Sequence, residues 1–564
     1  MIVNTTRLRW IAWALSAWAL VVALRLVQIQ VIEHKAWESG SARQREHPLE
    51  VEEPRGDIVT RDGRLLAGSL ERVAVYANPR KIPRDAWGTV AAGLAPIVGM
   101  PPATIRAQFR DHDGFFYLAK DLDPQVTDAI VMLQQRGVGT IQTERRVYPH
   151  GSLAGPVVGY INAEGNGQAG LEAFYDRTLR GVPSVYRVLR DGKKTSPTLI
   201  DLRLESEGRP GQSLAVTLDC RIQEVVEQEL ARTIAETGAK GASAVVIDPS
   251  DGEVLAMASL PSYDPGHLGQ SAPEGRRNRA VEDALEPGST FKPIIVAAAM
   301  TAGVLGPAEL VDCSGGGVVI ANVFIHDHAH YGLLPVREVL AKSSNTGAIR
   351  IAYRIGPSQL DDTIRQLGFG QPTRVELPAE TRGIYRGPQS WSALSRAGLA
   401  LGQEISATPL QVAQAYAAIA NGGLLVHPRL VLETRDRSGR SVTPYRAQPG
   451  VRVLSAEVAA RLASMLEAVV EEGTGKAAEV PGYRVAGKTG TAQRASSGNY
   501  SAGRHVAWFA GFLPMPDPSL VIVVCVDEPV SSYWAADVAA PAFGRIATRT
   551  VMLLGLEPTS GARA

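Results

Sequence analysis

The sequence is poor in cysteine, nearly balanced in charge and short of long apolar runs. Its three cysteines, Cys220, Cys313 and Cys525, are too few for a disulfide framework, although a single pairing among them stays open. Cys525 lies in the apolar run 520–526, which predicts a buried strand and a packing role for this thiol. A net charge of +1 gives no sign of a nucleic-acid partner or a strongly acidic one. Composition therefore leaves the function open.

One stretch, at the N-terminus, is apolar enough to suggest a membrane segment. Residues 10–32 are long enough to cross a bilayer, with Arg25 near the outer end, where its side chain can reach the interface. Arg7 and Arg9 favour a cytoplasmic N-terminus and an exported remainder, although basic residues also follow the run. A cleaved signal peptide is the alternative, but no small-x-small cleavage site follows directly. We expect a single-pass anchor after a cytoplasmic tail, residues 1–9.

The rest of the chain changes character near residue 205. Residues 33–205 mix strand and helix patterns without a catalytic grouping, which we interpret as a scaffold. Beyond them, residues 221–237 have the pattern of an amphipathic helix. Residues 242–248 and 253–258 form a predicted hairpin around an Asp-Gly turn. A helix beside antiparallel strands indicates helices packed on an antiparallel sheet.

The most informative stretch, residues 286–293, places Ser289 three residues before Lys292 at the start of an apolar helical run. Three residues are nearly one helical turn, so the hydroxyl and the amine are expected on one face, within reach of each other. A serine hydroxyl is a weak nucleophile unless an adjacent group accepts its proton, and a lysine can do so only when neutral. Burial and a second cation both lower a lysine pKa, and Lys488 is the expected second cation.

Two further triplets strengthen this signal. Ser-x-x-Lys alone is weak, because it occurs about once by chance in a chain of this length. Here it is followed, in order, by Ser-Ser-Asn at residues 343–345 and by Lys-Thr-Gly at residues 488–490. Ser-x-x-Lys, a Ser-x-Asn-type triplet and Lys-Thr-Gly form the signature of penicillin-binding proteins and serine β-lactamases. The ordered set predicts an assembled nucleophilic site, with Lys488 on a strand of the same sheet.

Three alternating histidines, His326, His328 and His330, form a competing pattern. On a strand they would share one face and could bind a metal. No matching cluster of Cys, His or Glu lies nearby, so we interpret the stretch as a polar loop or strand leading to the Ser343 region.

With these residues in hand, the chain resembles class B penicillin-binding proteins, membrane-anchored peptidoglycan D,D-transpeptidases, over nearly its whole length. The resemblance rests on the anchor, the three triplets and the segments 55–67 and 167–176. It implies an α+β fold with an N-terminal transmembrane helix and an elongated α+β pedestal, the dimerisation domain, over residues 33–205. A serine β-lactamase-like transpeptidase domain would follow over residues 206–555, before a C-terminal tail, residues 556–564. That domain would hold an antiparallel five-stranded sheet with helices on both faces and an all-helical subdomain.

The resemblance also implies a role for each motif residue. Ser289 would attack the carbonyl between the two terminal D-alanines of a stem peptide while Lys292 takes its proton. Ser343 would pass a proton to the departing amine, and Asn345 would hold the substrate backbone and the lysine. The carboxylate of the substrate would be bound at the third triplet and the residue after it: Lys488, Thr489, Gly490 and Thr491. The family uses neither a metal nor an organic cofactor.

Within class B, Asn345 and the segments 343–350, 402–411 and 415–423 look like the cell-division branch, since the elongation branch tends to carry an acidic residue at position 345. The implied partners are stem peptides and nascent glycan strands, β-lactams, a SEDS-type glycosyltransferase and other division proteins. The implied location is a bacterial cytoplasmic membrane at the division septum, with the bulk of the chain on the extracytoplasmic side. Four alternatives stay open: an elongation-type transpeptidase, a D,D-carboxypeptidase, a β-lactamase and a β-lactam sensor.

Overall fold

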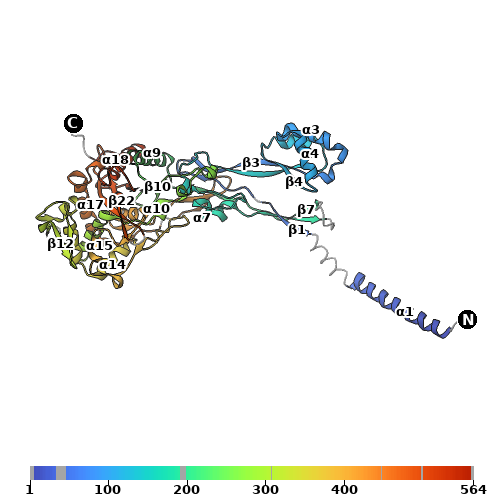
Figure 1. The fold of residues 1–564 in the computed structure, drawn as a ribbon, viewed down its shortest axis with the longest axis horizontal. Helices are drawn as coiled ribbons and strands as arrows, with labels where there is room; N and C mark the ends of the chain where they lie inside the picture. The colour runs from blue at the N-terminus through green and yellow to red at the C-terminus, as the bar shows by residue number, and fades with distance from the viewer. Residues whose placement is uncertain are drawn as a thin grey trace. The chain divides into compact units, whose positions relative to one another are not determined.

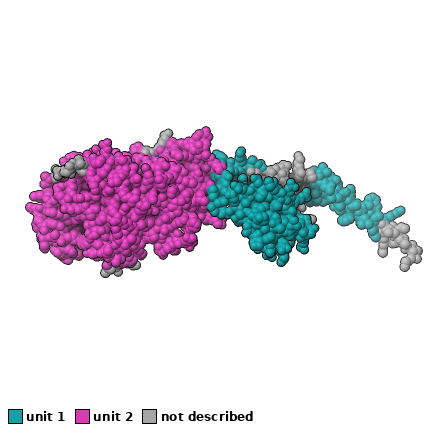
Figure 2. All heavy atoms as spheres, turned by 90° about the horizontal axis from the view of Figure 1, so that it is seen from above, with its two compact units in different colours: residues 1–54, 70–145, 181–210 teal, residues 55–69, 146–180, 211–564 magenta. Residues whose placement is uncertain are grey.

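The computed structural model describes seven stretches of the chain: residues 5–32, 46–51, 53–190, 199–306, 308–445, 448–496 and 499–559. They divide between two compact units, coloured separately in Figure 2. Unit 1 comprises residues 1–54, 70–145 and 181–210, and unit 2 comprises residues 55–69, 146–180 and 211–564. Unit 2 thus takes in two stretches that precede the domain boundary expected near residue 205. The outermost residues of the two expected tails, 1–4 and 560–564, lie outside the described residues.

The N-terminal helix α1 (Thr5–Val27) continues as a π-helical turn, η1 (Gln28–Ile32). Its 23-residue stretch Arg9–Val31 is the single helix of the described chain that is long and apolar enough to span a bilayer by itself, a test that a signal sequence also passes. At 1.5 Å per residue, such a helix is about 35 Å long, which covers a hydrocarbon core. Arg25 lies in its last turn and donates to Gln28 Oε1 at 2.8 Å.

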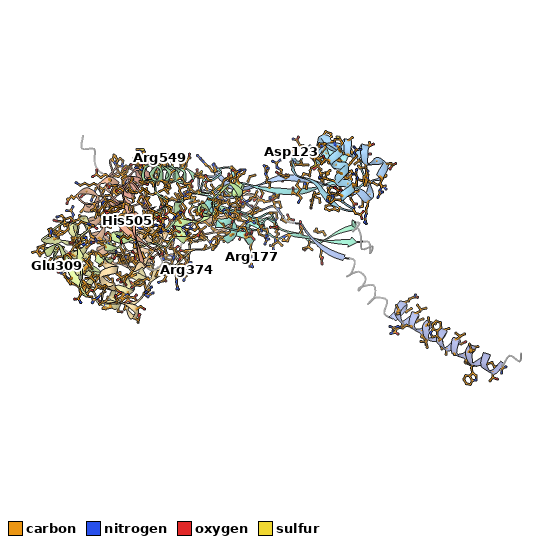
Figure 3. The ribbon with its side chains drawn as sticks, viewed as in Figure 1. Asp123, Arg177, Glu309, Arg374, His505 and Arg549 are labelled. Carbon is orange, nitrogen blue, oxygen red and sulfur yellow. The ribbon has the colours of Figure 1, made fainter. Side chains whose placement is uncertain are left out.

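Unit 1 contains a three-stranded antiparallel sheet and a small helical subdomain. The sheet has the order β1-β6-β7, and the subdomain packs helices against β3 and β4 around a core that includes Leu94, Ile105 and Phe109. Asp123, labelled in Figure 3, lies between β4 and α5 of this subdomain. The strand β3 begins among residues of unit 2, and β5 ends among them. The elements are β1 (Glu46–Val51), β3 (Leu65–Ala77), η2 (Pro79–Lys81), η3 (Arg84–Ala86), α3 (Trp87–Val98), α4 (Pro102–Asp111), β4 (Phe116–Leu122), α5 (Val126–Met132), β5 (Val138–Val147), β6 (Ser184–Arg190) and β7 (Leu199–Ser206).

Unit 2 is built on an antiparallel sheet, as the sequence patterns predict, and the sheet has the five strands that the resemblance implies. Its strand order is β10-β9-β23-β22-β21, so β21 lies at one edge. The predicted hairpin pairs Val245 with Met257, and the predicted apolar strand is buried at every position. The strands are β9 (Gly241–Ile247), β10 (Val254–Leu260), β21 (Ala486–Ser496), β22 (Asn499–Leu513) and β23 (Leu520–Asp527).

Helices cover both faces of this sheet, because alternate residues of its central strands point to opposite sides. Ile522 and Val524 pack in the cluster that holds α9 and α18, which lie side by side in Figure 1. Val523 and Cys525 pack in the cluster on the other face, with α11 and α16. All three cysteines are buried and none forms a disulfide, and Cys525 has the packing role predicted for it.

The helices of unit 2 begin where their sequences provide caps. Asp219 accepts from two backbone N–H groups at the start of α9, and Thr408 forms a capping box with Gln411 at the start of α16. The helical elements are α6 (Gly155–Val158), α7 (Gly170–Phe174), α8 (Asp176–Arg180), α9 (Cys220–Thr237), η4 (Pro265–Gln270), η5 (Pro273–Arg276), α10 (Arg279–Glu282), η6 (Gly288–Phe291), α11 (Lys292–Thr301), η7 (Ser314–Gly316), α12 (Val336–Ala341), α13 (Asn345–Arg354), α14 (Pro357–Gln366), η8 (Pro388–Ser390), α15 (Ser395–Ala400), α16 (Pro409–Ala420), α17 (Ala456–Glu471), η9 (Lys476–Ala478) and α18 (Ala539–Leu554).

Short strands complete unit 2. β2 and the start of β3 form the hairpin of the segment 55–67, with Ile58 opposite Ala67, and β2 also pairs with β8. The remaining strands are β2 (Ile58–Val59), β8 (Ser213–Val216), β11 (Leu310–Asp312), β12 (Gly317–Ile320), β13 (Val323–His326), β14 (Leu333–Pro335), β15 (Ile384–Tyr385), β16 (Ile405–Ser406), β17 (Leu424–Leu425), β18 (Val431–Arg435), β19 (Ser441–Pro444) and β20 (Val451–Arg452).

A buried ion network joins the two segments, 55–67 and 167–176, that precede the three sequence triplets. Glu172 is fully buried and forms ion pairs with Arg55 and Arg146 at 2.7 Å each. Arg55 also pairs with Asp176 at 2.8 Å. A buried carboxylate is stable only when its charge is balanced and hydrogen-bonded, so this network fixes the two segments against each other.

Candidate active site

Ser289 lies in a tight turn, η6, that leads directly into α11. Gly288 begins the turn with a φ of +55°, a conformation that glycine adopts without strain, and its N–H donates to Gly402 O at 3.1 Å. Tyr416, from α16, donates its phenolic proton to Thr290 O at 2.8 Å. The Ser289 side chain is partly exposed, whereas the helix that follows is buried. The turn therefore presents one hydroxyl to the surface from a rigid support.

Lys292 is fully buried one turn after Ser289. Its Nζ donates to Ser343 O at 2.5 Å, to Asn345 Oδ1 at 2.8 Å and to Ser343 Oγ at 3.2 Å. None of the hydrogen bonds among the described residues joins Lys292 Nζ to Ser289 Oγ. The amine is held by the second triplet instead, and catalytic hydrogen bonds are often long before substrate binds.

Burial lowers the pKa of Lys292 to about 7, and the negative charge of Asp327 opposes this effect. The direction agrees with the sequence-based expectation, and of the two expected causes, burial and the charge of Lys488, burial is the one that lowers the Lys292 pKa. A substantial fraction of Lys292 is therefore neutral near pH 7, as a proton acceptor must be.

Ser343 links Lys292 to Lys488. It has a φ of +56°, rare for a residue with a side chain, and it lies in the turn between α12 and α13. Its Oγ accepts from Lys488 Nζ at 3.0 Å as well as from Lys292 Nζ. When both amines are protonated they only donate, so the Ser343 hydroxyl then keeps its own proton to give to a third group. The strained turn thus places a proton donor between two lysines.

Lys488 lies on β21, the edge strand, and is fully buried. Its Nζ also contacts Thr489 O at 3.2 Å, and Thr489 Oγ1 lies 2.7 Å from Thr474 Oγ1. Burial first, and then the charge of Lys292, lower the pKa of Lys488 well below its usual range. The effect of one lysine charge on the other is therefore present, but acts mainly on Lys488.

The edge of β21 packs directly on the turn that carries Ser289. A Cβ at Gly490 would lie 2.5 Å from Pro287 O, too close for any side chain. The next residue, Thr491, accepts from Ala535 N–H at 3.1 Å through its Oγ1. The structure therefore brings together all eight residues predicted from sequence: Ser289, Lys292, Ser343, Asn345, Lys488, Thr489, Gly490 and Thr491.

Asp327 is a site residue that the sequence analysis missed. Its carboxylate accepts from Asn345 N–H, from Thr346 N–H at 3.2 Å and from Ser344 Oγ at 2.9 Å. The preceding carbonyl, of His326, accepts from Asn345 Nδ2 at 3.0 Å. Asp327 lies inside the His-Asp-His-Ala-His stretch, where the spacing of the histidines drew attention away from it. The stretch does lead from a strand, β13, to the Ser343 region.

A row of aromatic rings lies beside β21 and was also missed. His328 meets Trp534 edge-on at a centroid distance of 5.2 Å, Trp534 lies 4.8 Å from Tyr533, and Tyr533 stacks on His505 at 4.5 Å. His505 is labelled in Figure 3. Trp534 directly precedes the residue that donates to Thr491. The rings come from three segments that are distant in the sequence, so no local sequence pattern predicts the row.

Comparison with known proteins gives consistent matches. Residues 242–548 match the penicillin binding protein transpeptidase domain, and residues 50–215 match the penicillin-binding protein dimerisation domain. The chain is 32% identical over 546 residues to a probable peptidoglycan D,D-transpeptidase, PbpC, of Pseudomonas aeruginosa, covering 96% of this chain and 94% of that protein. It is 33% identical over 518 residues to peptidoglycan D,D-transpeptidase FtsI of Escherichia coli, covering 90% and 85%.

Solved structures agree with these matches. Penicillin binding protein 3 of Mycobacterium tuberculosis, in complex with ampicillin, matches with a TM-score of 0.71 and 29% identity over 92% of this chain and 98% of that one. The segment 242–548 contains every residue of the site described above.

Proposed function

The chain belongs to the class B penicillin-binding proteins, which are serine-type peptidoglycan D,D-transpeptidases, and we propose that it cross-links stem peptides through an acyl-enzyme on Ser289. The observation that carries this proposal is the buried chain Lys292–Ser343–Lys488 beside the Ser289 turn. It provides a proton acceptor, a proton donor and a cation around one accessible hydroxyl.

In the first step, Ser289 Oγ attacks the carbonyl between the two terminal D-alanines, and its proton passes to neutral Lys292. The negative charge that develops on the carbonyl oxygen is stabilised by the backbone N–H groups of Ser289 and Thr491, on the turn and on the strand that packs against it. In comparable sites, removing one such donor costs about 3 kcal/mol of barrier.

In the second half of acylation, the C–N bond breaks and the departing D-alanine amine takes a proton. Ser343 gives that proton and regains one from Lys292, to which it is hydrogen-bonded at 3.2 Å. Lys488, Thr489 and Thr491 bind the terminal carboxylate, because a cation with two hydroxyls suits a planar anion. Asn345 keeps Lys292 in place and meets the substrate backbone.

The acyl-enzyme then reacts with an amine of a neighbouring stem peptide, which forms the cross-link and frees Ser289. A β-lactam acylates the same hydroxyl, but its leaving group stays tethered through the opened ring and blocks the incoming amine. In the D,D-carboxypeptidase alternative, water takes the place of the amine, and release of D-alanine without cross-linked product would identify it.

We place this activity in septal wall synthesis, with the Arg9–Val31 helix as anchor in a bacterial cytoplasmic membrane and unit 2 on the extracytoplasmic side. The similarity to FtsI and the presence of Asn345, rather than an acidic residue, support the cell-division branch. A SEDS-type glycosyltransferase and other division proteins would be its partners. A tagged protein should form a band at mid-cell, and uniform side-wall labelling would favour the elongation branch.

The acyl-enzyme is tested by covalent labelling of the detergent-solubilised chain with a fluorescent penicillin. Wild type should be labelled stably and Ser289→Ala should not. Ser438→Ala, which removes a hydroxyl from an exposed turn, is the matched control and should label like wild type. Persistent labelling of Ser289→Ala, or a folded wild type that is never labelled, would contradict the proposal.

A further inference from the structure

Asp327 lies behind the second triplet rather than in the path of the proposed chemistry. Its buried carboxylate takes hydrogen bonds from the first two N–H groups of α13, those of Asn345 and Thr346, and from the Ser344 hydroxyl. A helix N-terminus carries a partial positive charge, which stabilises an ionised carboxylate there. Asp327 thus fixes the turn that holds Ser343 and Asn345 against Lys292.

The negative charge of Asp327 is not taken up by a direct ion pair. None of the ion pairs formed by the described residues includes it, although the exposed Asp312 nearby is paired with Arg350 on α13. Its charge acts instead on Lys292, raising the pKa of that amine against the lowering that burial causes. Lys488, on β21, is the other cation that faces Lys292.

Three titratable groups around Asp327 and the lysines are neutral near pH 7, and the charged side chains nearby are the paired Asp312 and Arg350 and, over the Tyr331 ring, Lys342. Burial, the largest cause, lowers the pKa of His328 and raises the pKa of Cys313 and Tyr331. His326, whose ring is exposed, is the remaining titratable neighbour in the chain. A charge change at position 327 therefore acts on Lys292, and also on His328, Cys313 and Tyr331.

We propose that Asp327 is a positioning residue for Lys292: its hydrogen bonds hold the Ser343–Asn345 turn, and its charge stabilises the ammonium that forms when Ser289 gives up its proton. The proposal rests on acylation of Ser289. In that step the Ser289 O–H bond breaks, the proton joins Lys292 Nζ, and the new cation lies in a buried site where Asp327 provides the counter-charge. Asp327 touches neither the substrate nor the reacting atoms.

Asp327→Asn separates the two parts of this role, because it removes the charge and keeps the shape. The amide oxygen can still accept from the two N–H groups, and the amide nitrogen can donate to Ser344 Oγ, which has a free lone pair for it. Without the charge, Lys292 loses its proton more readily and becomes a weaker base. In a plot of acylation rate against pH, the acid limb, where the rate falls as the pH drops, should move to lower pH. The plateau rate reached above this limb should fall by about tenfold.

The experiment measures the rate constant for labelling of the full detergent-solubilised chain by a fluorescent penicillin, from about pH 5 to pH 9. Wild type is compared with Asp327→Asn, with the matched charge removal Asp312→Asn, and with His326→Gln. A lower-pH acid limb in Asp327→Asn alone supports the proposal. An unshifted limb in Asp327→Asn, even with a lower plateau, overturns it, because a merely structural role moves the plateau only.

Two further outcomes keep this test distinct from that of the acyl-enzyme. If wild type labels and Ser289→Ala does not, an unshifted Asp327→Asn profile refutes the role of Asp327 alone. If wild type never labels, the acyl-enzyme proposal fails and the role of Asp327 fails with it. Asp327→Ala removes the hydrogen bonds as well, and its plateau should fall by about 100-fold through misplacement of the turn. Asp327→Asn decides the matter even if Asp327→Ala does not fold.

Discussion

Gly402→Ala is expected to disable the site without changing a reacting group. Gly402 has a φ of +71°, and a Cβ there would lie 1.9 Å from Gly288 O and 2.6 Å from Gly288 C. Real Cβ contacts are essentially never shorter than 3.0 Å, so one of the two backbones must move by about 1 Å. Either movement disturbs the contact between Gly402 and Gly288 that supports the turn carrying Ser289. A misplacement of about 1 Å can cost about 100-fold in rate, equal to about 2.7 kcal/mol of barrier.

Gly422→Ala provides the matched control for this variant. Gly422 has nearly the same φ, +74°, but a Cβ there meets nothing within 4 Å. Both alanines bear a left-handed backbone cost of about 1 kcal/mol, so both should lower the melting temperature slightly, and Gly402→Ala should lower it more. The acylation rate with a fluorescent penicillin separates them. If Gly402→Ala acylates within about threefold of Gly422→Ala, the close fit at Gly288 does not position Ser289.

Three other predictions concern Lys292, Ser343 and Glu172. The wild-type acylation rate should fall as the pH drops below about 7, because Lys292 then gains a proton and stops accepting one, and a flat profile across this range would contradict its role as base. Ser343→Ala removes the hydroxyl that accepts hydrogen bonds from both lysines, and it should slow acylation by about 100-fold. An unchanged acylation rate constant would show that Ser343 takes no part in the mechanism. Glu172→Gln leaves buried Arg146 without its counter-charge and leaves Arg55 with Asp176 alone, and it should lower the free energy of unfolding by about 3 kcal/mol. Urea denaturation measures this against the exposed control Glu164→Gln, and equal stability of the two variants would argue against the network.

The parts of the site that depend on residues close together in the sequence could be predicted from it. Ser289 and Lys292 lie in one turn, so their spacing along the chain fixes their separation in space. Lys488 precedes an apolar strand pattern, which places it correctly on the sheet. The apolar pattern of residues 520–526 likewise gives β23, buried on both faces.

The parts that depend on contacts between distant segments could not be predicted. Asp327 meets Asn345 only because the segment that follows β13 folds back on the start of α13, and an isolated aspartate between histidines carries no sign of that contact. The aromatic row joins rings from three segments, His328, His505 and the pair Tyr533–Trp534. The Arg55–Glu172 pair spans 117 residues. In each case the chain provides the residues and the tertiary fold provides their neighbours.

The cause of the low Lys292 pKa shows a subtler limit of sequence reasoning. Proximity to Lys488 suggested that the charge of one lysine keeps the other neutral. In the structure, burial acts first on both amines, and the charge of Lys292 then lowers the pKa of Lys488, whereas the charge that acts on Lys292 is that of Asp327. Which amine holds a proton therefore depends on what else enters the site.

A substrate carboxylate decides that question in the proposed mechanism. Bound at Lys488, it stabilises the ammonium there, and the charge of Lys488 then lowers the Lys292 pKa further, so carboxylate recognition and proton acceptance reinforce each other. A penicillin with its carboxylate esterified lacks this effect. At a saturating drug concentration, the acylation rate depends on the ionisation of groups in the enzyme–drug complex. The rate with the ester should therefore begin to fall at a higher pH than the rate with the free acid. Equal limbs for acid and ester would mean that Lys488 does not couple substrate binding to the base.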